Sequence, residues 1–299
     1  MADLPRRQLG RTGLKVTPLG YGAMELRGRD REVTDADAAA ILNAVLDAGI
    51  NYIDTSIDYG VSEERIGKAI AHRRSEYYLA SKCGCLVGPQ AAQASGRAPH
   101  VFTAENVKAG VEQSLERMKT DYLDLVQFHA SPTPAELREN GGLDALLELQ
   151  QQGKVRHVGM SGMLPNLTDQ IAMGVFDVFQ VPYSALQREH ENLIQQAAAA
   201  GAGVVVRGGV ARGDPVKQKG NLWDIWQEAS LDDLLGNMTR MEFMLRFTIS
   251  HPGMATTIVG TVSRDHLQEN LRALQQGPLP GEIYTVAKSR LAAAGSAPA

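Results

Sequence analysis

Cysteine is scarce in this sequence. The 299 residues contain only two, Cys83 and Cys85, in the run CGC. Cysteines separated by one residue rarely form a well-shaped disulfide, and two thiols alone do not complete a structural zinc site. The sequence therefore predicts two reduced thiols, as in a cytosolic protein, and no metal site.

Long apolar runs and a strong excess of one charge are also missing. The most apolar window, residues 197–206, is far too short to cross a membrane, and the start MADLPRRQLG has no apolar run typical of a signal peptide. The net charge is −4, and no basic patch stands out, which argues against nucleic acid as a partner. These absences predict a cytoplasmic protein with neither membrane nor nucleic acid as a partner.

A glycine-rich phosphate turn is missing as well. The first strand-like run carries Gly20, Gly22 and Ala23 without the GxGxxG spacing that opens a doubly wound dinucleotide-binding sheet. That open sheet is the main alternative to the architecture predicted next, and the absence of the turn disfavours it.

Short apolar runs alternate with helix-like runs along nearly the whole chain. The strand-like runs are residues 19–23, 51–55, 77–82, 122–129, 155–161, 176–184, 203–209 and 256–261. The helix-like runs that follow them are residues 34–49, 62–72, 103–118, 141–154, 165–173, 190–201, 242–250 and 263–274. Eight consecutive units without a low-complexity linker predict an α/β fold, a single (β/α)8 TIM barrel over residues 1–299.

Local signals refine this prediction. Thr34, Ser62 and Thr103 stand where helix N-caps are expected. Residues 210–236 after the seventh strand form the longest stretch without clear periodicity, which predicts a functional or mobile loop. The last four residues, 296–299, are expected to fray.

Polar residues stand at the ends of three consecutive strands. Asp54, Lys82 and His129 end the second, third and fourth strands, and Tyr59 follows Asp54 in the loop. Each residue alone has an ordinary explanation: a turn cap, a rim ion pair, a core imidazole or partly buried packing. Because the active sites of such barrels lie at the C-terminal strand ends, the four together predict a catalytic group.

This combination suits proton donation to a carbonyl oxygen. A phenol has a pKa of about 10, and a neighbouring ammonium such as that of Lys82 is expected to lower it. Asp54 would keep Lys82 charged, Tyr59 would act as general acid, and His129 would orient the substrate oxygen. No side chain transfers hydride, so this chemistry implies a nicotinamide cofactor.

Seven segments resemble, in order, the motifs of the aldo-keto reductase superfamily. They are residues 7–25, 49–70, 79–84, 126–132, 154–161, 179–184 and 258–271. The resemblance covers essentially the whole chain. It implies an (α/β)8 barrel with an N-terminal β-hairpin at its bottom, NADPH bound without a Rossmann motif, and a catalytic tetrad of Asp54, Tyr59, Lys82 and His129.

The resemblance also implies the cofactor contacts. Gly22, Ala23 and Asp54 would line the reacting ring, Ser161 and Gln180 its carboxamide, and Glu269 and Asn270 the adenine end. The other candidates follow the seventh and eighth strands: Arg207, Gly208, Val210, Arg212, Gly260, Thr261, Ser263, Arg264 and His266.

Three departures from the family pattern affect these expectations. Gly162 replaces an asparagine that often follows Ser161. Arg207 stands where an aromatic residue commonly stacks, and we expect its planar guanidinium to cover the nicotinamide. His266 occupies the place of an arginine that often binds the 2′-phosphate, with Arg264 as its substitute, so NADPH is expected and NADH stays possible.

The expected reaction is reduction of a small-molecule aldehyde or ketone to an alcohol. Candidate substrate contacts are Met24, Tyr59, His129, Trp223 and Trp226, although the spacing of the tryptophans equally suits packing on the barrel rim. Two alternatives stay open: a cofactor-sensing regulatory protein with little turnover, and a Schiff-base enzyme that uses Lys82. The oligomeric state is left open.

Overall fold

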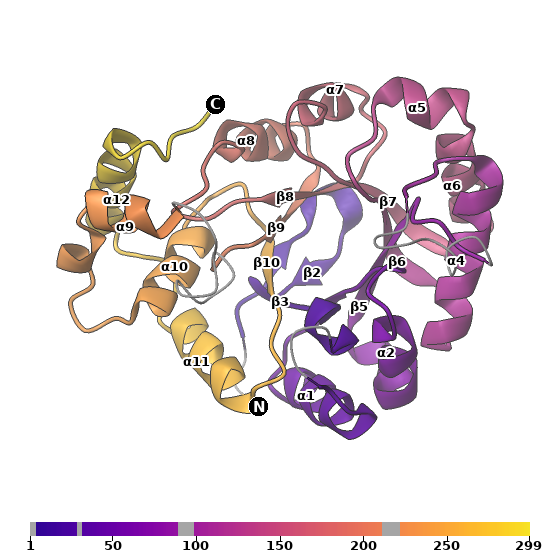
Figure 1. Ribbon diagram of the computed structural model, residues 1–299, viewed down its shortest axis with the longest axis horizontal. Helices are drawn as coiled ribbons and strands as arrows, with labels where there is room; N and C mark the ends of the chain where they lie inside the picture. Colours follow the sequence, from indigo (N-terminus) through magenta and orange to yellow (C-terminus); the bar gives the residue numbers. More distant parts are fainter. Residues whose placement is uncertain (1–3, 29–31, 89–98, 211–221) are drawn as a thin grey trace.

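Eight parallel strands close into a barrel in the computed structural model, which describes residues 4–28, 32–88, 99–210 and 222–299 (Figure 1). The strands are β3 (Leu19–Gly22), β4 (Tyr52–Asp54), β5 (Tyr78–Cys83), β6 (Leu123–Phe128), β7 (Val155–Ser161), β8 (Val178–Pro182), β9 (Gly203–Arg207) and β10 (Thr256–Val259). Each pairs with the next along the chain, and β10 closes the ring against β3. The predicted barrel is confirmed, and the open doubly wound sheet is excluded.

A helix follows each strand and covers the outside of the barrel (Figure 1). These helices are α1 (Asp35–Asp47), α2 (Ser62–Ile70), α4 (Ala104–Met118), α6 (Gly142–Gln151), α7 (Leu167–Ala172), α8 (Glu191–Ala199), α10 (Arg240–Ile249) and α11 (Arg264–Gln275). Additional helices are α5 (Pro134–Glu139), α9 (Leu222–Glu228) and α12 (Gly281–Ala293), with 3-10 turns at Gly10–Thr12, Ala23–Arg27, Ala71–Glu76 and Leu231–Leu234. In the ranges that the structure describes, every helix is too short or too polar to cross a membrane.

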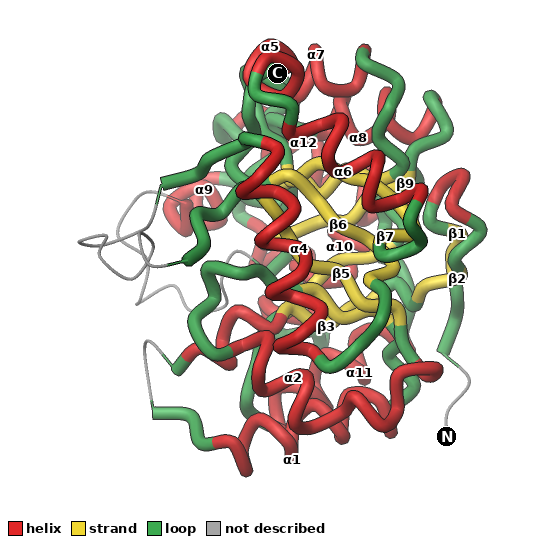
Figure 2. The backbone as a smooth tube through the Cα atoms, turned by 90° about the vertical axis from the view of Figure 1, so that its right-hand side faces the viewer, coloured by secondary structure: helices red, strands yellow, loops and turns green. Residues whose placement is uncertain are grey.

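The N-terminal hairpin consists of β1 (Arg7–Gln8) and β2 (Lys15–Val16) and lies outside one end of the barrel (Figure 2). Leu9 and Val16 are completely buried and belong to the same apolar cluster as Leu125 and Val178 of the barrel strands. A Cβ atom on Gly203 would lie 2.7 Å from Leu9 Cγ, so glycine at the start of β9 lets the hairpin approach. The predicted hairpin is confirmed.

The helix caps agree with the sequence in two of three cases. Thr34 forms a capping box with Asp37 at the start of α1, and the Thr103 hydroxyl accepts a hydrogen bond from the Asn106 N–H in α4. The prediction for Ser62 is wrong. Its hydroxyl donates to the Ala23 carbonyl at 2.9 Å, and Val61 occupies the N-cap position. The side chain is used to join α2 to the loop after β3.

Two segments expected to be irregular are partly or fully ordered. The described part of residues 210–236 contains α9 and a 3-10 turn, because Trp226 and Leu231 are fully buried and fix this segment to the core; a functional role for the segment stays a prediction. The expected fraying of residues 296–299 is wrong. Ser296 is 4% exposed and donates to the Ala185 carbonyl, and the Ala299 N–H donates to the Glu189 carbonyl.

Candidate active site

Strand register places polar side chains side by side at the C-terminal end of the barrel. Asp54 of β4 is paired with Gly22 of β3, and Lys82 of β5 is paired with Gln127 of β6. Further round the ring, Ser161 of β7 is paired with Gln180 of β8. Side chains at paired positions point to the same face of a sheet, so these groups share one face of the barrel wall.

Asp54 is the centre of a buried hydrogen-bond network. Lys82 Nζ donates to Asp54 Oδ1 at 2.6 Å and to the Thr55 carbonyl at 2.8 Å. The other carboxylate oxygen, Oδ2, accepts from Gln180 Nε2 at 2.8 Å and from Gln127 Nε2 at 3.1 Å. Asp54 and Lys82 are each 1% exposed. The acid and amine singled out from the sequence therefore form a buried ion pair.

The ion pair keeps Lys82 charged. Burial alone would lower the pKa of the Lys82 ammonium, but its interactions with nearby groups, of which the negative charge of Asp54 is the largest, outweigh this effect and raise the pKa. Gln127 was not predicted as part of this group. It precedes His129 by two positions in the strand-like run, and a period of two would have placed both side chains on one face.

Tyr59 lies in the loop between β4 and α2, close to the other predicted catalytic residues. Lys82 Nζ is 5.0 Å from the centre of the Tyr59 ring, and the ring centres of Tyr59 and His129 are 6.2 Å apart at an angle of 82°. The phenol, ammonium, carboxylate and imidazole thus converge at one end of the barrel, as the sequence suggested.

The pKa of Tyr59 does not follow the sequence-based expectation. Burial raises the pKa above 10, and the attraction of the Lys82 ammonium opposes this rise without overcoming it. The charges of Asp54 and Asp58 add to the increase. The expectation of a lowered pKa is therefore wrong, and the Tyr59 phenol is a neutral group that keeps its proton.

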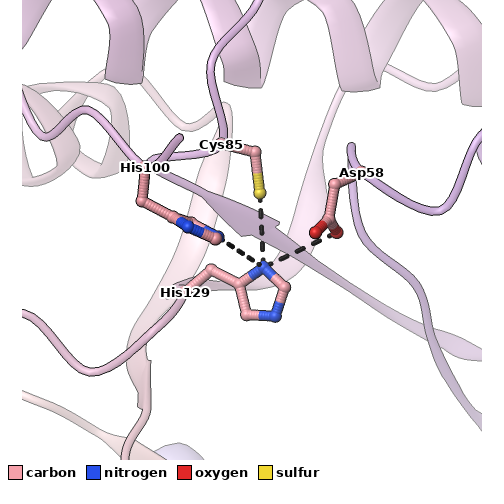
Figure 3. A group of neighbouring side chains, drawn as sticks. All are labelled: Asp58, Cys85, His100 and His129. Carbon is pink, nitrogen blue, oxygen red and sulfur yellow. Dashed lines mark hydrogen bonds and ion pairs between the residues drawn. The ribbon is translucent and has the colours of Figure 1, made fainter. Parts of the chain in front are cut away.

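Four side chains of metal-binding type meet beside the ion pair, and we call them the mouth cluster: Asp58, Cys85, His100 and His129 (Figure 3). The first three surround one atom, Nδ1 of His129. Burial raises the pKa of the Cys85 thiol to about 12, so without a bound cation the thiol is neutral and a poor nucleophile. Cys85 follows the strand of Lys82 closely, whereas His100 carried no signal in the sequence.

Comparison with known proteins agrees with this geometry. The family model described as "Aldo/keto reductase family" matches residues 18–221. The chain belongs to this family. It is accordingly an NAD(P)H-dependent oxidoreductase, and its relatives carry names of the same kind.

Similar proteins match nearly the whole chain. The solved structure titled "aldo-keto reductase AKR11C1 from Bacillus halodurans (holo form)" superposes with a TM-score of 0.85 and 30% identity over 96% of each chain. "Uncharacterized oxidoreductase YqkF" of Bacillus subtilis (strain 168) is 28% identical, with 90% of each chain covered. "Pyridoxine 4-dehydrogenase" of Escherichia coli (strain K12) is 30% identical, covering 86% of this chain and 89% of the relative.

The carboxamide-binding pair expected of an aldo/keto reductase is in contact. The Ser161 hydroxyl donates to Gln180 Oε1 at 3.4 Å, and both residues are buried. The structure also explains the glycine that follows Ser161. A Cβ atom on Gly162 would lie 2.5 Å from Gln170 Oε1, and that amide is held by a 2.6 Å bond to the Pro132 carbonyl. A side chain at position 162 would collide with this network.

The ends of β3 and β10 approach each other closely. A Cβ atom on Gly260 would lie 2.7 Å from the Gly22 carbonyl oxygen, so glycine is needed at this junction. The Tyr21 hydroxyl donates to the Thr261 carbonyl at 2.8 Å and fixes the segment after β10. Ala23 is buried and Met24 half-buried at the start of the 3-10 turn that follows β3.

The remaining cofactor candidates surround the start of α11. Ser263 is its N-cap, and its hydroxyl accepts from the His266 N–H at 3.4 Å, while its own N–H donates to the Thr261 hydroxyl. Arg264, His266 and Glu269 are exposed on α11, and Asn270 is half-buried. The side chains of Arg264, His266 and Glu269 therefore face solvent, whereas the hydroxyls of Ser263 and Thr261 are used in the cap.

Three further cofactor candidates lie at and after the end of β9, the strand next to β10. Arg207 is the last residue of β9, is half-buried, and is paired with Ile258 of β10. Gly208 follows with a φ of +73°, a conformation that favours glycine. Val210 is half-buried at the end of this stretch. Arg212 lies outside the residues that the structure describes.

The two tryptophans pack together on the core side of α9. Their ring centres are 5.6 Å apart, and Trp226 is fully buried with its indole N–H donated to Asp232. Trp226 also contacts Phe243 edge-on, at 5.4 Å between ring centres. Trp223 is 8% exposed. Packing on the barrel rim therefore explains why the two tryptophans are three residues apart. For Trp226 these contacts favour a packing role over contact with a substrate.

Proposed function

We propose that this aldo/keto reductase reduces an aldehyde or ketone to the alcohol, with NADPH as cofactor and Tyr59 as general acid. The observation that supports this most strongly is the meeting of Tyr59, Lys82 and His129 at the C-terminal end of the barrel. A phenol beside a charged amine and an imidazole is suited to protonating an oxygen that gains negative charge.

In this proposal each residue has a separate task. Tyr59 is protonated before reaction, and donates its proton to the carbonyl oxygen as negative charge develops there. Lys82, kept charged by Asp54, stabilises the phenolate that Tyr59 becomes. His129 holds the carbonyl oxygen in line through a ring N–H. The nicotinamide, when bound, supplies the hydride.

Several features of the chain suit a nicotinamide dinucleotide. The buried amide and hydroxyl of Gln180 and Ser161 are matched to a carboxamide, because each offers both a donor and an acceptor. Glycine at position 260 lets the ends of β3 and β10 approach closely, because a Cβ atom there would lie 2.7 Å from the Gly22 carbonyl oxygen. The N-terminal end of α11, a helix of 12 residues, presents N–H groups that favour a phosphate. Arg207 would cover the nicotinamide ring from the end of β9.

The preference for NADPH over NADH rests on charge at the start of α11. Arg264 and His266 are both exposed there and available to a 2′-phosphate. Fluorescence titration with each dinucleotide is expected to give tighter binding of NADPH in the wild type. In Arg264→Ala the affinity for NADPH should fall at least several-fold, and the affinity for NADH should not change. Equal or tighter binding of NADH by the wild type would exclude the proposed preference.

Tyr59→Phe tests the proposed chemistry. Oxidation of the reduced cofactor by a panel of aldehydes and ketones should fall by roughly 10²- to 10⁴-fold in this variant, because general acid catalysis is lost. Cofactor affinity should stay at the wild-type value. Tyr78→Phe is the matched control, since Tyr78 begins β5 at the opposite end of the barrel. Turnover that survives loss of the Tyr59 hydroxyl would contradict the mechanism.

The same assay separates this proposal from a cofactor-sensing protein. A wild-type chain that binds NADPH tightly and turns over no carbonyl in the panel would favour the sensing role. Rapid turnover that is abolished in Tyr59→Phe would favour the reductase.

A further inference from the structure

The proposed reduction uses His129 but gives no task to the three side chains around its Nδ1 atom. Figure 3 shows Asp58, Cys85 and His100 pointing toward this nitrogen from three directions, while the second ring nitrogen of His129 points away from them. The three come from separate places in the chain: the loop after β4 and two positions in the segment between β5 and α4. The mouth cluster therefore needs a separate explanation.

The contacts around this nitrogen exceed what hydrogen bonding requires. Cys85 Sγ and His100 Nε2 each lie 3.3 Å from His129 Nδ1, and Asp58 Oδ1 lies 3.6 Å from it. A ring nitrogen carries either one hydrogen or one lone pair in the ring plane, and so makes one good hydrogen bond. A metal ion, in contrast, accepts a lone pair from every atom of such a group.

The separations match the edges of a tetrahedron around zinc. Zn–N bonds of about 2.0–2.1 Å, Zn–S bonds of about 2.3 Å and Zn–O bonds of about 2.0–2.2 Å place neighbouring ligand atoms about 3.3–3.6 Å apart. The three contacts with Nδ1 fall in this range, and all four ligand atoms lie within 4.8 Å of one another. Binding of an ion would draw the remaining pairs of ligand atoms to the same separation.

The backbone holds two of the ligands opposite each other. Cys85 and His100 form an antiparallel β-bridge, which two further bonds extend: Leu86 N–H to the Pro99 carbonyl and Val101 N–H to the Gly84 carbonyl. Asn106 of α4 fastens this pair of segments by donating from its side-chain amide to the Cys85 and Val101 carbonyls. Hydrogen bonds among the described residues thus fix the backbone that carries Cys85 and His100.

The other two ligands are positioned as well. The Ser56 hydroxyl donates to Asp58 Oδ1 at 2.7 Å and orients the carboxylate. The backbone N–H of His129 donates to the Cys83 carbonyl, which ties the end of β6 to β5 and fixes the main chain that carries the imidazole. Ligands whose orientation is fixed by such outer contacts lose little freedom when an ion binds.

We propose that the mouth cluster binds one divalent ion of the Zn²⁺ class with tetrahedral geometry. One thiolate, two imidazoles and one carboxylate are ligands that zinc prefers, whereas Mg²⁺ and Ca²⁺ require mainly oxygen. This replaces the sequence-based expectation of no metal site, which considered the two cysteines only with each other. Ion binding itself does not rest on the proposed reductase function, whereas the consequence for His129 given next does.

An ion in this site joins three loops at the mouth of the barrel. It also binds His129 through Nδ1, which leaves the ring hydrogen on Nε2. The ring then presents an N–H donor on the side away from the ion, the form that His129 needs to hold a carbonyl oxygen. The ion therefore acts as a positioning element next to the catalytic group.

Direct metal titration tests the site without reference to catalysis. The full chain, treated with a chelator and transferred to metal-free buffer, is titrated with Zn²⁺ by calorimetry and with Co²⁺ by absorption spectroscopy. We expect one ion per chain, tetrahedral Co²⁺ bands and a thiolate-to-cobalt charge-transfer band. Thermal unfolding should shift to higher temperature with Zn²⁺, because the ion binds the folded state.

Cys85→Ser and His100→Ala provide the variants, and Cys83→Ala is the matched control. Cys83 is a fully buried thiol two residues away that lies outside the cluster. The charge-transfer band should vanish in Cys85→Ser, Zn²⁺ affinity should fall at least tenfold in both variants, and the control should behave as wild type. A wild-type chain that binds Co²⁺ without a thiolate band, or binds no ion at all, overturns the proposal even if a variant fails to fold. Carbonyl turnover measured on the same samples reports separately on the proposed reductase function.

Discussion

At the scale of single residues, Asp54 connects side chains from three other strands of the barrel. Its two carboxylate oxygens accept hydrogen bonds from Lys82, Gln127 and Gln180, which belong to three different strands. The carboxylate thereby connects the proposed general acid region to the proposed carboxamide site. It also supplies the charge that offsets the desolvation of the Lys82 ammonium.

Asp54→Asn removes that charge and keeps the shape. Without it, burial is expected to lower the pKa of Lys82, so the amine loses its proton at a lower pH than in the wild type. Carbonyl reduction should slow, and the alkaline limb of its pH–rate profile should move to lower pH. Chemical denaturation should show a loss of about 3–5 kcal/mol at neutral pH, because a charged amine is left buried without its partner.

Asp35→Asn is the control for this effect. Asp35 pairs with Lys68 and Arg65 on the protein surface, where water screens the charges. Its loss should leave the pH–rate profile in place. An unchanged profile in Asp54→Asn as well would show that the carboxylate does not govern the charge of Lys82.

At the scale of elements, Arg188 is one of the side chains that join α12 and the C-terminal residues to the segment at the start of α8. Arg188 is 3% exposed and pairs with Glu191 at 2.6 Å. Its guanidinium also donates to the carbonyls of Lys288 and Ser296, both at 2.9 Å. A single side chain therefore satisfies an acid on α8 and two carbonyls in and after α12.

Arg188→Ala should lower the free energy of unfolding by about 3 kcal/mol. This estimate lies at the lower end for a broken buried pair, because Glu191 keeps Lys288 as a second partner. Arg290→Ala is the matched control on α12. Its pair with Asp233 is more exposed, so its removal should cost less than about 1 kcal/mol. Urea denaturation of both variants measures the difference, and equal losses would contradict a special role for Arg188.

The sequence predicted the elements that follow from periodicity and missed those that depend on distant contacts. Apolar runs located the eight strands, and the rule that barrel sites lie at strand ends located Asp54, Lys82 and His129. Nothing local showed that the last residues would be held by Arg188, so fraying was expected instead. Cys85 and His100 were missed for a similar reason, because a β-bridge across a long segment brings them together.

The pKa of Tyr59 shows a second limit of sequence reasoning. The sequence identified the charges that act on the phenol but not the extent of its burial. Burial turned out to be the larger effect and reversed the direction of the shift. The sign of a pKa shift in a partly closed site thus depends on packing that composition and spacing do not reveal.

At the scale of the whole molecule, closing the barrel buries several tyrosines. Burial raises the pKa of Tyr52 and Tyr183 well above 10 and that of Tyr77 to about 12. These phenols are neutral in both the folded and the unfolded chain below pH about 10. Above that pH the unfolded chain loses the protons first, so it binds fewer protons than the folded chain and the free energy of unfolding falls.

Tyr52→Phe tests this alkaline dependence at the centre of the barrel. The Tyr52 hydroxyl is completely buried and has no hydrogen-bond partner among the described residues. Its removal should raise the free energy of unfolding by about 1 kcal/mol at neutral pH, because no buried polar group is left unsatisfied. Above pH about 10 the variant should lose about 1.4 kcal/mol less per pH unit than the wild type.

Tyr77→Phe separates the gain in stability at neutral pH from the smaller loss of stability at alkaline pH. The Tyr77 hydroxyl donates to the Ile70 carbonyl at 3.4 Å, so its removal should bring no gain at neutral pH. The variant should still lose less free energy of unfolding per pH unit than the wild type. This difference should be confined to the range between pH about 10, where the phenol of the unfolded chain titrates, and pH about 12, where that of the folded chain does. Urea denaturation at a series of alkaline pH values compares both variants with the wild type. A wild-type stability that stays constant up to pH about 12 would contradict the argument, because desolvation of the phenolates then could not be the dominant effect.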